Sequence, residues 1–149
     1  MEYFTILSHG TGIALQIKWR ERIMKIAIPV CTGHVSTVFD FAHRLLLFDI
    51  DRGTVVMCSE ISFEEGSPMY RAKVLSRSEI QVLICGSISH QSVKLLSNYG
   101  IEVIPFVTGS VDDVLSAYLN DSLSDPRFLL PGTKPEMREK WKNKEHEKE

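Results

Sequence analysis

After residue 66 the sequence alternates between helix and strand patterns, and this alternation constrains the fold more than any other feature of the chain. The stretch SPMYRAKVLSR (67–77) predicts a helix, because Ser67 can cap it and Pro68 suits a first helical position. The apolar run VLICG (82–86) predicts a buried strand, and SHQSVKLLSNYG (89–100) predicts the next helix. Strands that alternate with helices pair in parallel through right-handed crossovers, which indicates the α/β class.

Two further segments extend the alternation to residue 120. IEVIPF (101–106) predicts another buried strand. SVDDVLSAYLN (110–120) gives the clearest helix signal, because its apolar residues recur at helical spacing. Asp112 and Asp113 lie in its first turn, where the helix dipole favours negative charge. We therefore expect a parallel, helix-covered sheet in the second half of the domain.

The first half of the domain carries strand patterns without helices between them. From Met24 onward, KIAIPV (25–30) is a short apolar run that suits a buried strand. RLLLFDID (44–51) and TVVMCSEI (54–61) are separated by an Arg-Gly turn, which is the pattern of an antiparallel hairpin. Together with the later strands, these segments predict a mixed five-stranded sheet.

The chain of 149 residues is long enough for one domain with a core of its own. Residues 1–23 lack both the basic start and the sustained apolar stretch of a signal peptide, so we interpret them as a leader or as the product of a misassigned start codon. Residues 24–123 are the expected α/β domain. Residues 124–149 are interpreted as a flexible tail, because from Lys134 onward the charges alternate with little to bury except Met137 and Trp141.

Charge and cysteine content exclude several classes of protein. A net charge of -2, from 17 basic and 19 acidic residues, provides no basic surface for nucleic acid. No apolar run approaches the roughly 18 residues that span a membrane. The three cysteines are too few and too scattered for a disulfide framework. We therefore expect a protein of the reducing cytoplasm, whose oligomeric state the sequence leaves open.

Much of the chain from Met24 to Leu123 resembles the dinitrogenase iron–molybdenum cofactor biosynthesis family of small domains. The resemblance lies in the opening strand MKIAIPV, the Ser-x-x-Phe segment from Ser36 to Phe39, the glycine after the fourth strand, and the spacing of the Gly-Ile-x-Val and Thr-Gly-x-Val segments. It implies a ribonuclease-H-like, three-layer α/β/α fold. The implied strand order is 3-2-1-4-5, with strand 2 antiparallel.

The same resemblance implies a non-enzymatic protein that binds or carries a metal–sulfur cofactor of the iron–molybdenum type, or a precursor of it. The implied cofactor is an iron–sulfur or molybdenum–iron–sulfur cluster, and the implied partners are proteins that donate or accept it. The chain departs from the family at VFDF (38–41), where the family often has His-Phe-Gly-Arg, and at CGSISH (85–90), where it often has Gly-Gly-Ile-Gly. The ligands do not carry over directly, so a regulatory or interaction module that has lost cofactor binding is the alternative hypothesis.

The implied strand order places the first and fourth strands side by side, at the point where the winding of the chain changes direction. Ligands of open α/β sheets bind outside the carboxyl ends of the strands at such a point. Each of these strands ends near a cysteine that a histidine soon follows, and thiolate and imidazole suit copper(I), zinc or iron–sulfur chemistry. We therefore expect the two cysteines to lie close together as metal ligands, with the histidines as further ligands. The candidate cofactor-binding residues are Cys31, His34, Ser36, Cys85, Gly86 and His90.

Each cysteine also has a second interpretation, as a small apolar residue of the core. We interpret Cys58, inside the third strand, in this way. A nuclease of the same fold type would need carboxylates that converge on the central strands, whereas Asp49 and Asp51 lie at the far end of the second strand. No nucleophile elbow, phosphate-binding loop or dinucleotide fingerprint occurs either. The sequence therefore predicts no enzymatic activity.

Overall fold

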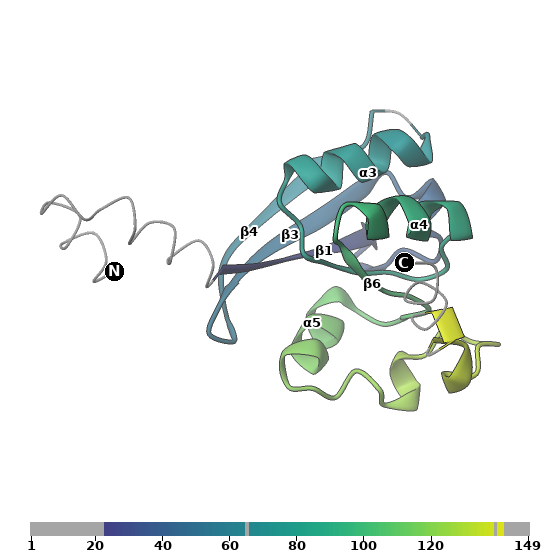
Figure 1. The fold of residues 1–149 in the computed structure, drawn as a ribbon. Coiled ribbons are helices and arrows are strands. Elements are labelled where there is room, and N and C mark those ends of the chain that lie inside the picture. The colour runs from purple at the N-terminus through teal and green to yellow at the C-terminus, as the bar shows by residue number, and fades with distance from the viewer. Residues whose placement is uncertain (1–22, 65, 139, 142–149) are drawn as a thin grey trace, which may run out of the picture.

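The computed structural model describes residues 23–64, 66–138 and 140–141 (Figure 1). A mixed sheet runs through its centre, with strands in the order β4-β3-β1-β5-β6 and β2 paired to β1. β1 pairs antiparallel with β3 and parallel with β5, and β5 pairs parallel with β6. These pairings confirm the prediction of an α/β fold with a mixed sheet. The strands are β1 (Ile23–Cys31), β2 (His34–Val35), β3 (Arg44–Asp51), β4 (Thr54–Ser62), β5 (Val82–Ile84) and β6 (Glu102–Ile104).

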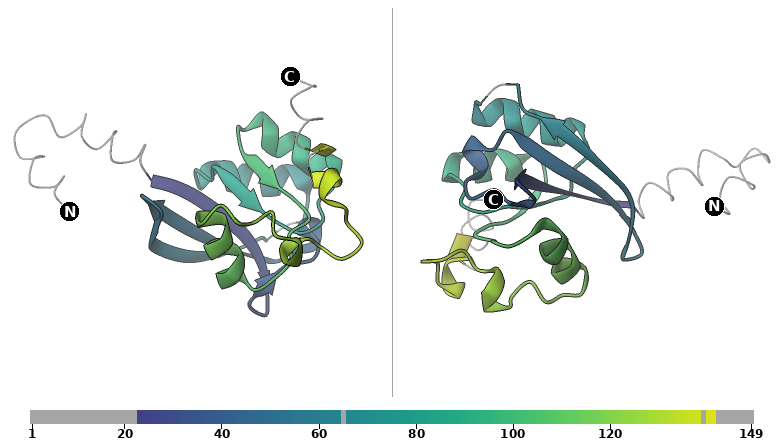
Figure 2. Two further views of the ribbon diagram at one scale, coloured as in Figure 1. Left: turned by 90° about the horizontal axis from the view of Figure 1, so that it is seen from below. Right: turned by 180° about the vertical axis from the view of Figure 1, so that it is seen from behind.

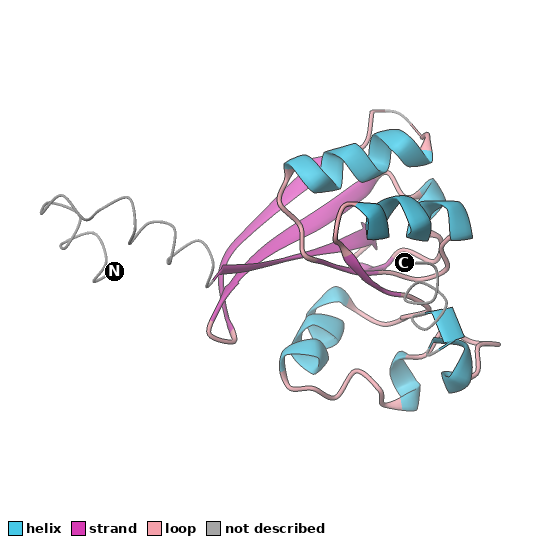
Figure 3. Cartoon of the chain, viewed as in Figure 1, coloured by secondary structure: helices cyan, strands magenta, loops and turns pink. Residues whose placement is uncertain are grey.

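Helices lie on both faces of this sheet (Figures 1 and 3). α3 and α4 cover one face and α5 covers the other. Each of the three is preceded by a serine whose hydroxyl accepts an N–H of the first turn, which explains where the helices begin. The helical elements are α3 (Pro68–Arg77), α4 (His90–Asn98), α5 (Val111–Leu119) and the short 3-10 turns η2 (Phe39–Phe41) and η3 (Pro126–Phe128).

β1 separates two layers of apolar core. Its side chains point alternately to the two faces, as in any strand, so Ile26 and Ile28 pack on the α5 side and Ala27 packs under α3 and α4. All three are fully buried. β1 can be apolar without interruption because both of its faces are covered, in agreement with the sequence pattern from residue 25 to residue 30.

The β3–β4 hairpin extends past the helices at its turn end (Figure 2). β4 forms the edge of the sheet and is exposed along nearly its whole length, including Val56 and Met57. Cys58 lies on this strand and is exposed, so its interpretation as a core residue is wrong. The apolar pattern of β4 suggested burial, but the helices do not reach far enough across the sheet to cover it.

The chain after α5 packs against the domain more extensively than its many charged residues suggest. Phe128 is buried in the core layer on the α5 side, and Trp141 packs against the layer under α3 and α4. The structure thus extends the packed part of the chain beyond the expected boundary at residue 123. Residues 1–22 of the predicted leader and residues 142–149 of the predicted tail lie outside the described residues. No helix within the described ranges is long and apolar enough to cross a membrane.

Candidate functional site

A tight turn at the end of β1 brings two of the predicted ligands together. Thr32 and Gly33 both have positive φ angles, 48° and 79°, which is the geometry of a type I′ hairpin turn. The chain therefore folds straight back, and Cys31 and His34 become direct partners across β1 and β2. Directly opposed residues of an antiparallel pair project their side chains to the same face, with Cβ atoms about 5 Å apart. Both residues are exposed, so one ligand can reach both.

The ring of His34 is oriented by a hydrogen bond inside this turn. Its Nδ1 lies 3.2 Å from the carbonyl oxygen of Thr32. A carbonyl oxygen can only accept, so the hydrogen bond requires the proton on Nδ1. In the neutral ring with this proton on Nδ1, Nε2 carries the free lone pair through which imidazole binds metal ions.

The crevice expected between the ends of β1 and β5 is filled by the chain that follows the turn. The N–H of Ser36 donates to the carbonyl of Pro29 (2.8 Å), and the N–H of Ser87 donates to the carbonyl of Thr37 (2.7 Å). Gly86 fits under this segment because it has no side chain: a Cβ there would lie 2.4 Å from the Thr37 carbonyl oxygen. The winding of the sheet does change direction here, but the returning chain occupies the space because β1 is much longer than β5.

Cys85 lies inside the core and not beside Cys31. It is completely buried in the layer under α3 and α4. Burial raises the pKa of its thiol, the charge of Asp40 adds to this effect, and Arg138 opposes it. Ala27 pairs with Leu83 in the parallel ladder of β1 and β5. Two residues further along both strands, Pro29 therefore lies opposite Cys85. The structure therefore places one predicted cysteine ligand in solvent and the other in the core as a protonated thiol.

Asp40 holds the start of α4, and sequence analysis did not identify it. Its carboxylate accepts hydrogen bonds from the N–H of Ser89 (2.8 Å), the hydroxyl of Ser89 (2.8 Å) and the hydroxyl of Ser92 (2.5 Å). A helix N-terminus attracts anions, and here a carboxylate of the same chain fills that position. The sequence signal was a single aspartate in the VFDF segment, which does not reveal a partner 49 residues away.

Arg71 of α3 fixes the segment that carries Asp40. Its guanidinium is buried and donates from Nη1 to the carbonyls of Phe39 (3.0 Å) and Ala42 (2.7 Å). It also lies over the ring of Phe63, 4.3 Å from the centroid. Desolvation lowers the pKa of Arg71, and the charge of Asp40 opposes this effect. α3 is thereby tied to the loop that runs from β2 to β3.

His90, the last predicted ligand, is the first residue of α4, where it is exposed and stacks against an aromatic ring. The ring of Trp141 stacks on it with a centroid distance of 4.0 Å and an interplanar angle of 9°. Trp141 also meets the ring of Phe106 edge to face, at 5.3 Å. Three of the predicted metal ligands, Cys31, His34 and His90, are thus exposed, and the fourth, Cys85, is buried.

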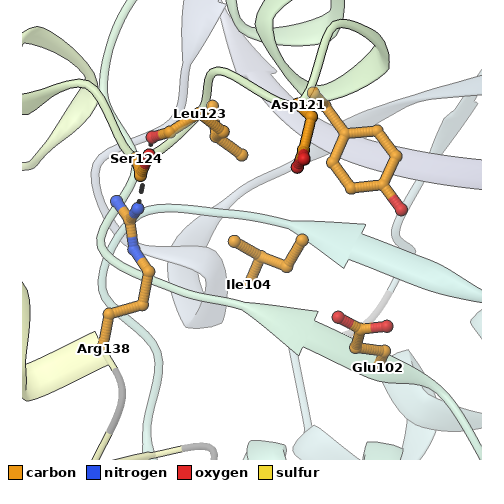
Figure 4. Close-up of a pocket in the computed structure, with 7 residues that line it drawn as sticks. Glu102, Ile104, Asp121, Leu123, Ser124 and Arg138 are labelled. Atoms are coloured by element: carbon orange, nitrogen blue, oxygen red, sulfur yellow. Dashed lines mark hydrogen bonds between the residues drawn. The ribbon is translucent and has the colours of Figure 1, made fainter.

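A separate cavity of about 280 Å³ opens beside β6 (Figure 4). Arg138 lies at one end, where its guanidinium donates to the carbonyl of Leu123 (3.4 Å). Glu102 lies at the other end. Tyr118 also lines the cavity, and burial together with the charge of Glu102 raises its pKa. None of the six predicted site residues lines this cavity. Throughout the described part of the chain, no group of three or more His, Cys, Asp or Glu side chains could hold a metal ion.

Comparisons with known proteins relate this chain to a family and to several solved structures. The family model described as "Dinitrogenase iron-molybdenum cofactor" matches residues 22–121. The crystal structure of a "putative dinitrogenase" from Methanocaldococcus jannaschii is similar, with 23% identity, a TM-score of 0.57, and coverage of 67% of this chain and 91% of that chain. The apo form of the orange protein from Desulfovibrio gigas matches with 20% identity, a TM-score of 0.56, and coverage of 67% and 90%. At these identities the likeness shows the fold alone. No match was found among curated proteins.

Proposed function

Because the chain belongs to the dinitrogenase iron-molybdenum cofactor family, we propose that it binds and carries a metal–sulfur cluster of the iron–molybdenum type, or a precursor of such a cluster. The observation that supports this proposal is the exposed pair of Cys31 and His34. Thiolate sulfur and imidazole nitrogen are the ligands that such clusters and their metals accept.

The arrangement of this pair suits a cargo better than a permanent cofactor. Structural metal sites are closed by four protein ligands, whereas this hairpin offers two. A cluster bound by two exposed side chains keeps its other positions open to ligands from a donor or an acceptor protein. The pair is also built on a two-residue turn, which fixes the spacing of the ligands without enclosing the bound group.

The finer features of the family belong to the same proposal. We infer a ribonuclease-H-like fold, a cytoplasmic location, and exchange of the cluster with a donor or acceptor protein. We also infer that the protein is not an enzyme. The carboxylates Asp49 and Asp51 lie on β3 at the end that pairs with the beginning of β1, far along the strand from the Cys31–His34 turn.

Metal uptake by matched variants tests the proposal. The protein is incubated anaerobically with ferrous iron and sulfide, with or without tetrathiomolybdate, and then desalted. Bound iron and molybdenum are measured by elemental analysis, together with visible absorption. We expect Cys31→Ser and His34→Ala each to lower metal retention at least about tenfold, since even outer-shell partners of a metal change affinity by 10- to 100-fold.

Cys58→Ser is the matched control, because Cys58 is equally exposed but lies on β4. It should retain as much metal as the parent protein. Equal retention by all three variants would show that the Cys31–His34 pair does not bind the cluster.

The second candidate function is a regulatory or interaction module that has lost cofactor binding. Two observations favour it: Asp40 fills the anion-binding position at the start of α4, and Cys85 is buried. The module would remain colourless and metal-free in the incubation that loads a carrier. The same elemental analysis therefore decides between the two functions.

A further inference from the structure

The last described residues of the chain return to the end of the sheet at which β5 and β6 end (Figure 2). We call residues 134–138 and 140–141 the C-terminal strap. Arg138 anchors it by donating from Nε to the carbonyl of Pro105 (2.9 Å) and from Nη2 to the carbonyl of Phe106 (3.1 Å). Trp141 anchors it a second time, through its ring contacts with His90 and Phe106.

Most of the other described residues of the strap are exposed. Lys134, Pro135, Glu136 and Lys140 are exposed, and Met137 is 38% exposed. A segment with few buried apolar contacts opens at a lower free energy than the core to which it is attached. Arg138 and Trp141 therefore supply the main contacts described between this segment and the domain.

The strap lies near both predicted ligands that the hairpin does not present, of which His90 is exposed and Cys85 is buried. Trp141 stacks directly on His90. It also packs against the core layer that contains Cys85, which has no exposed surface. Arg138 carries a charge that acts on the Cys85 thiol, so the anchor lies near that residue as well.

We propose that the C-terminal strap is a cover that opens as a unit while the domain stays folded, and that its opening exposes the Cys85 thiol. This inference concerns access to one buried thiol. It holds whether or not the Cys31–His34 pair carries a cluster, and it is tested without metal.

Thiol labelling measures the opening directly. The chain has three cysteines, so Cys31→Ser combined with Cys58→Ser leaves Cys85 as the one reactive thiol. The rate of its reaction with an aromatic disulfide reagent is followed at increasing low concentrations of guanidinium chloride. Opening of the strap alone exposes little surface, so the rate should depend weakly on denaturant, whereas global unfolding gives a steep dependence.

Removal of either anchor should speed the reaction. We expect Trp141→Ala and Arg138→Ala, each in this single-cysteine background, to raise the labelling rate about tenfold or more and to keep the weak dependence on denaturant. Leu115→Ala is the control, because Leu115 is buried on the opposite side of the sheet. It should raise labelling only through global unfolding, with a steep dependence on denaturant.

The outcomes are distinct. An unchanged rate in both anchor variants would overturn the proposal, and so would a faster rate that has the steep denaturant dependence of the Leu115→Ala control.

Tryptophan fluorescence provides a second measurement, at the anchor itself. The variant Trp19→Phe leaves Trp141 as the single tryptophan. In that variant the emission of Trp141 should move to longer wavelength at denaturant concentrations below those that unfold the sheet, and a single coincident transition would overturn the proposal.

Discussion

Asp40 uses both of its carboxylate oxygens to hold the start of α4 through Ser89 and Ser92. Asp40→Ala leaves the hydroxyl of Ser92, which is 2% exposed, without its charged acceptor. Hydrogen bonds to charged groups contribute about 1.5–3 kcal/mol each, so we expect the free energy of unfolding to fall by about 2–3 kcal/mol. Asp40→Asn keeps one acceptor oxygen and should cost less. Denaturant titration measures both.

Asp112→Ala provides the control for Asp40. Asp112 also lies in the first turn of a helix, but it is exposed on α5. Its interaction with the helix dipole is worth at most about 1 kcal/mol. If Asp40→Ala and Asp112→Ala destabilise the protein equally, the network at α4 contributes no more than an ordinary surface charge does.

The raised pKa of Cys85 predicts that the folded protein loses stability at alkaline pH. Its pKa is raised from the ordinary 9.0 by burial first and by Asp40 second. The folded protein therefore keeps the thiol proton where the unfolded chain has lost it, and the stability that results is fully present below pH 9 and declines as the pH rises above it. We expect the free energy of unfolding to fall by about 1.4 kcal/mol per pH unit above pH 9, measured by denaturant titration from pH 8 to pH 10.

Cys85→Ala should weaken this pH dependence even though the smaller side chain lowers stability at every pH. Cys58→Ser should preserve it, because Cys58 is exposed. Tyr118, whose pKa is also raised, acts in the same direction at higher pH, so the range stops at pH 10. A slope that is identical in Cys85→Ala and in the parent protein would assign the effect to other groups.

The chemistry of single residues could be predicted from the sequence only in part. Cys31 and His34 were identified because they lie near the end of a strand, and the structure brings them together. Cys85 was identified by the same rule, yet it is buried, since exposure depends on what the loop after β1 and the C-terminal strap cover. Asp40 and Arg71 were missed because each has partners about 30 to 50 residues away along the chain.

At the scale of the elements, the chain that follows β2 (the β2 segment, residues 36 and 37) crosses the end of β5 directly over Gly86. Only a glycine leaves room for this crossing. A Cβ at Gly86 would meet two backbone oxygens, at 2.4 Å from Thr37 and 2.7 Å from Ser36. Backbone atoms cannot move aside as a flexible side chain can. Gly86→Ala should therefore lower the free energy of unfolding by about 3 kcal/mol, the upper end of the range for overpacked sites, as measured by denaturant titration.

Gly66→Ala is the matched substitution in a loop. No atom lies within 4 Å of a Cβ there, and no left-handed φ is required. The change should stay within about 0.5 kcal/mol of the parent protein. Equal stability of the Gly86→Ala and Gly66→Ala variants would mean that the β2 segment can shift away from β5.

The helices were more predictable than the hairpins. Serine caps and apolar spacing located α3, α4 and α5 to within about two residues, because these signals are local. β2 was not anticipated, since a strand of two residues has no periodicity to detect. The exposure of β4 was also unexpected: its pattern resembles that of a buried strand, and the helix cover that would decide the matter is a tertiary property.

At the scale of the whole molecule, stability should decrease from the centre of the sheet towards the edge at β4. β1 is hydrogen-bonded on both sides and buried between two core layers. Among the described residues, β4 pairs only with β3, and Val55, Val56 and Met57 are exposed. The two strands belong to the same sheet but differ in burial and in the number of strands that pair with them, and both properties limit local opening.

Amide hydrogen exchange tests this gradient. The amides of Ile26 and Ile28 should be among the slowest of the domain, and those of β4 should exchange at least about 100-fold faster on average, because β4 can open without global unfolding. The measurement is repeated at two protein concentrations. If β4 is as well protected as β1 at both concentrations, another segment of the same chain covers the edge. If its protection rises with concentration, a second copy pairs with the edge, because exposed apolar edge strands readily accept a further strand.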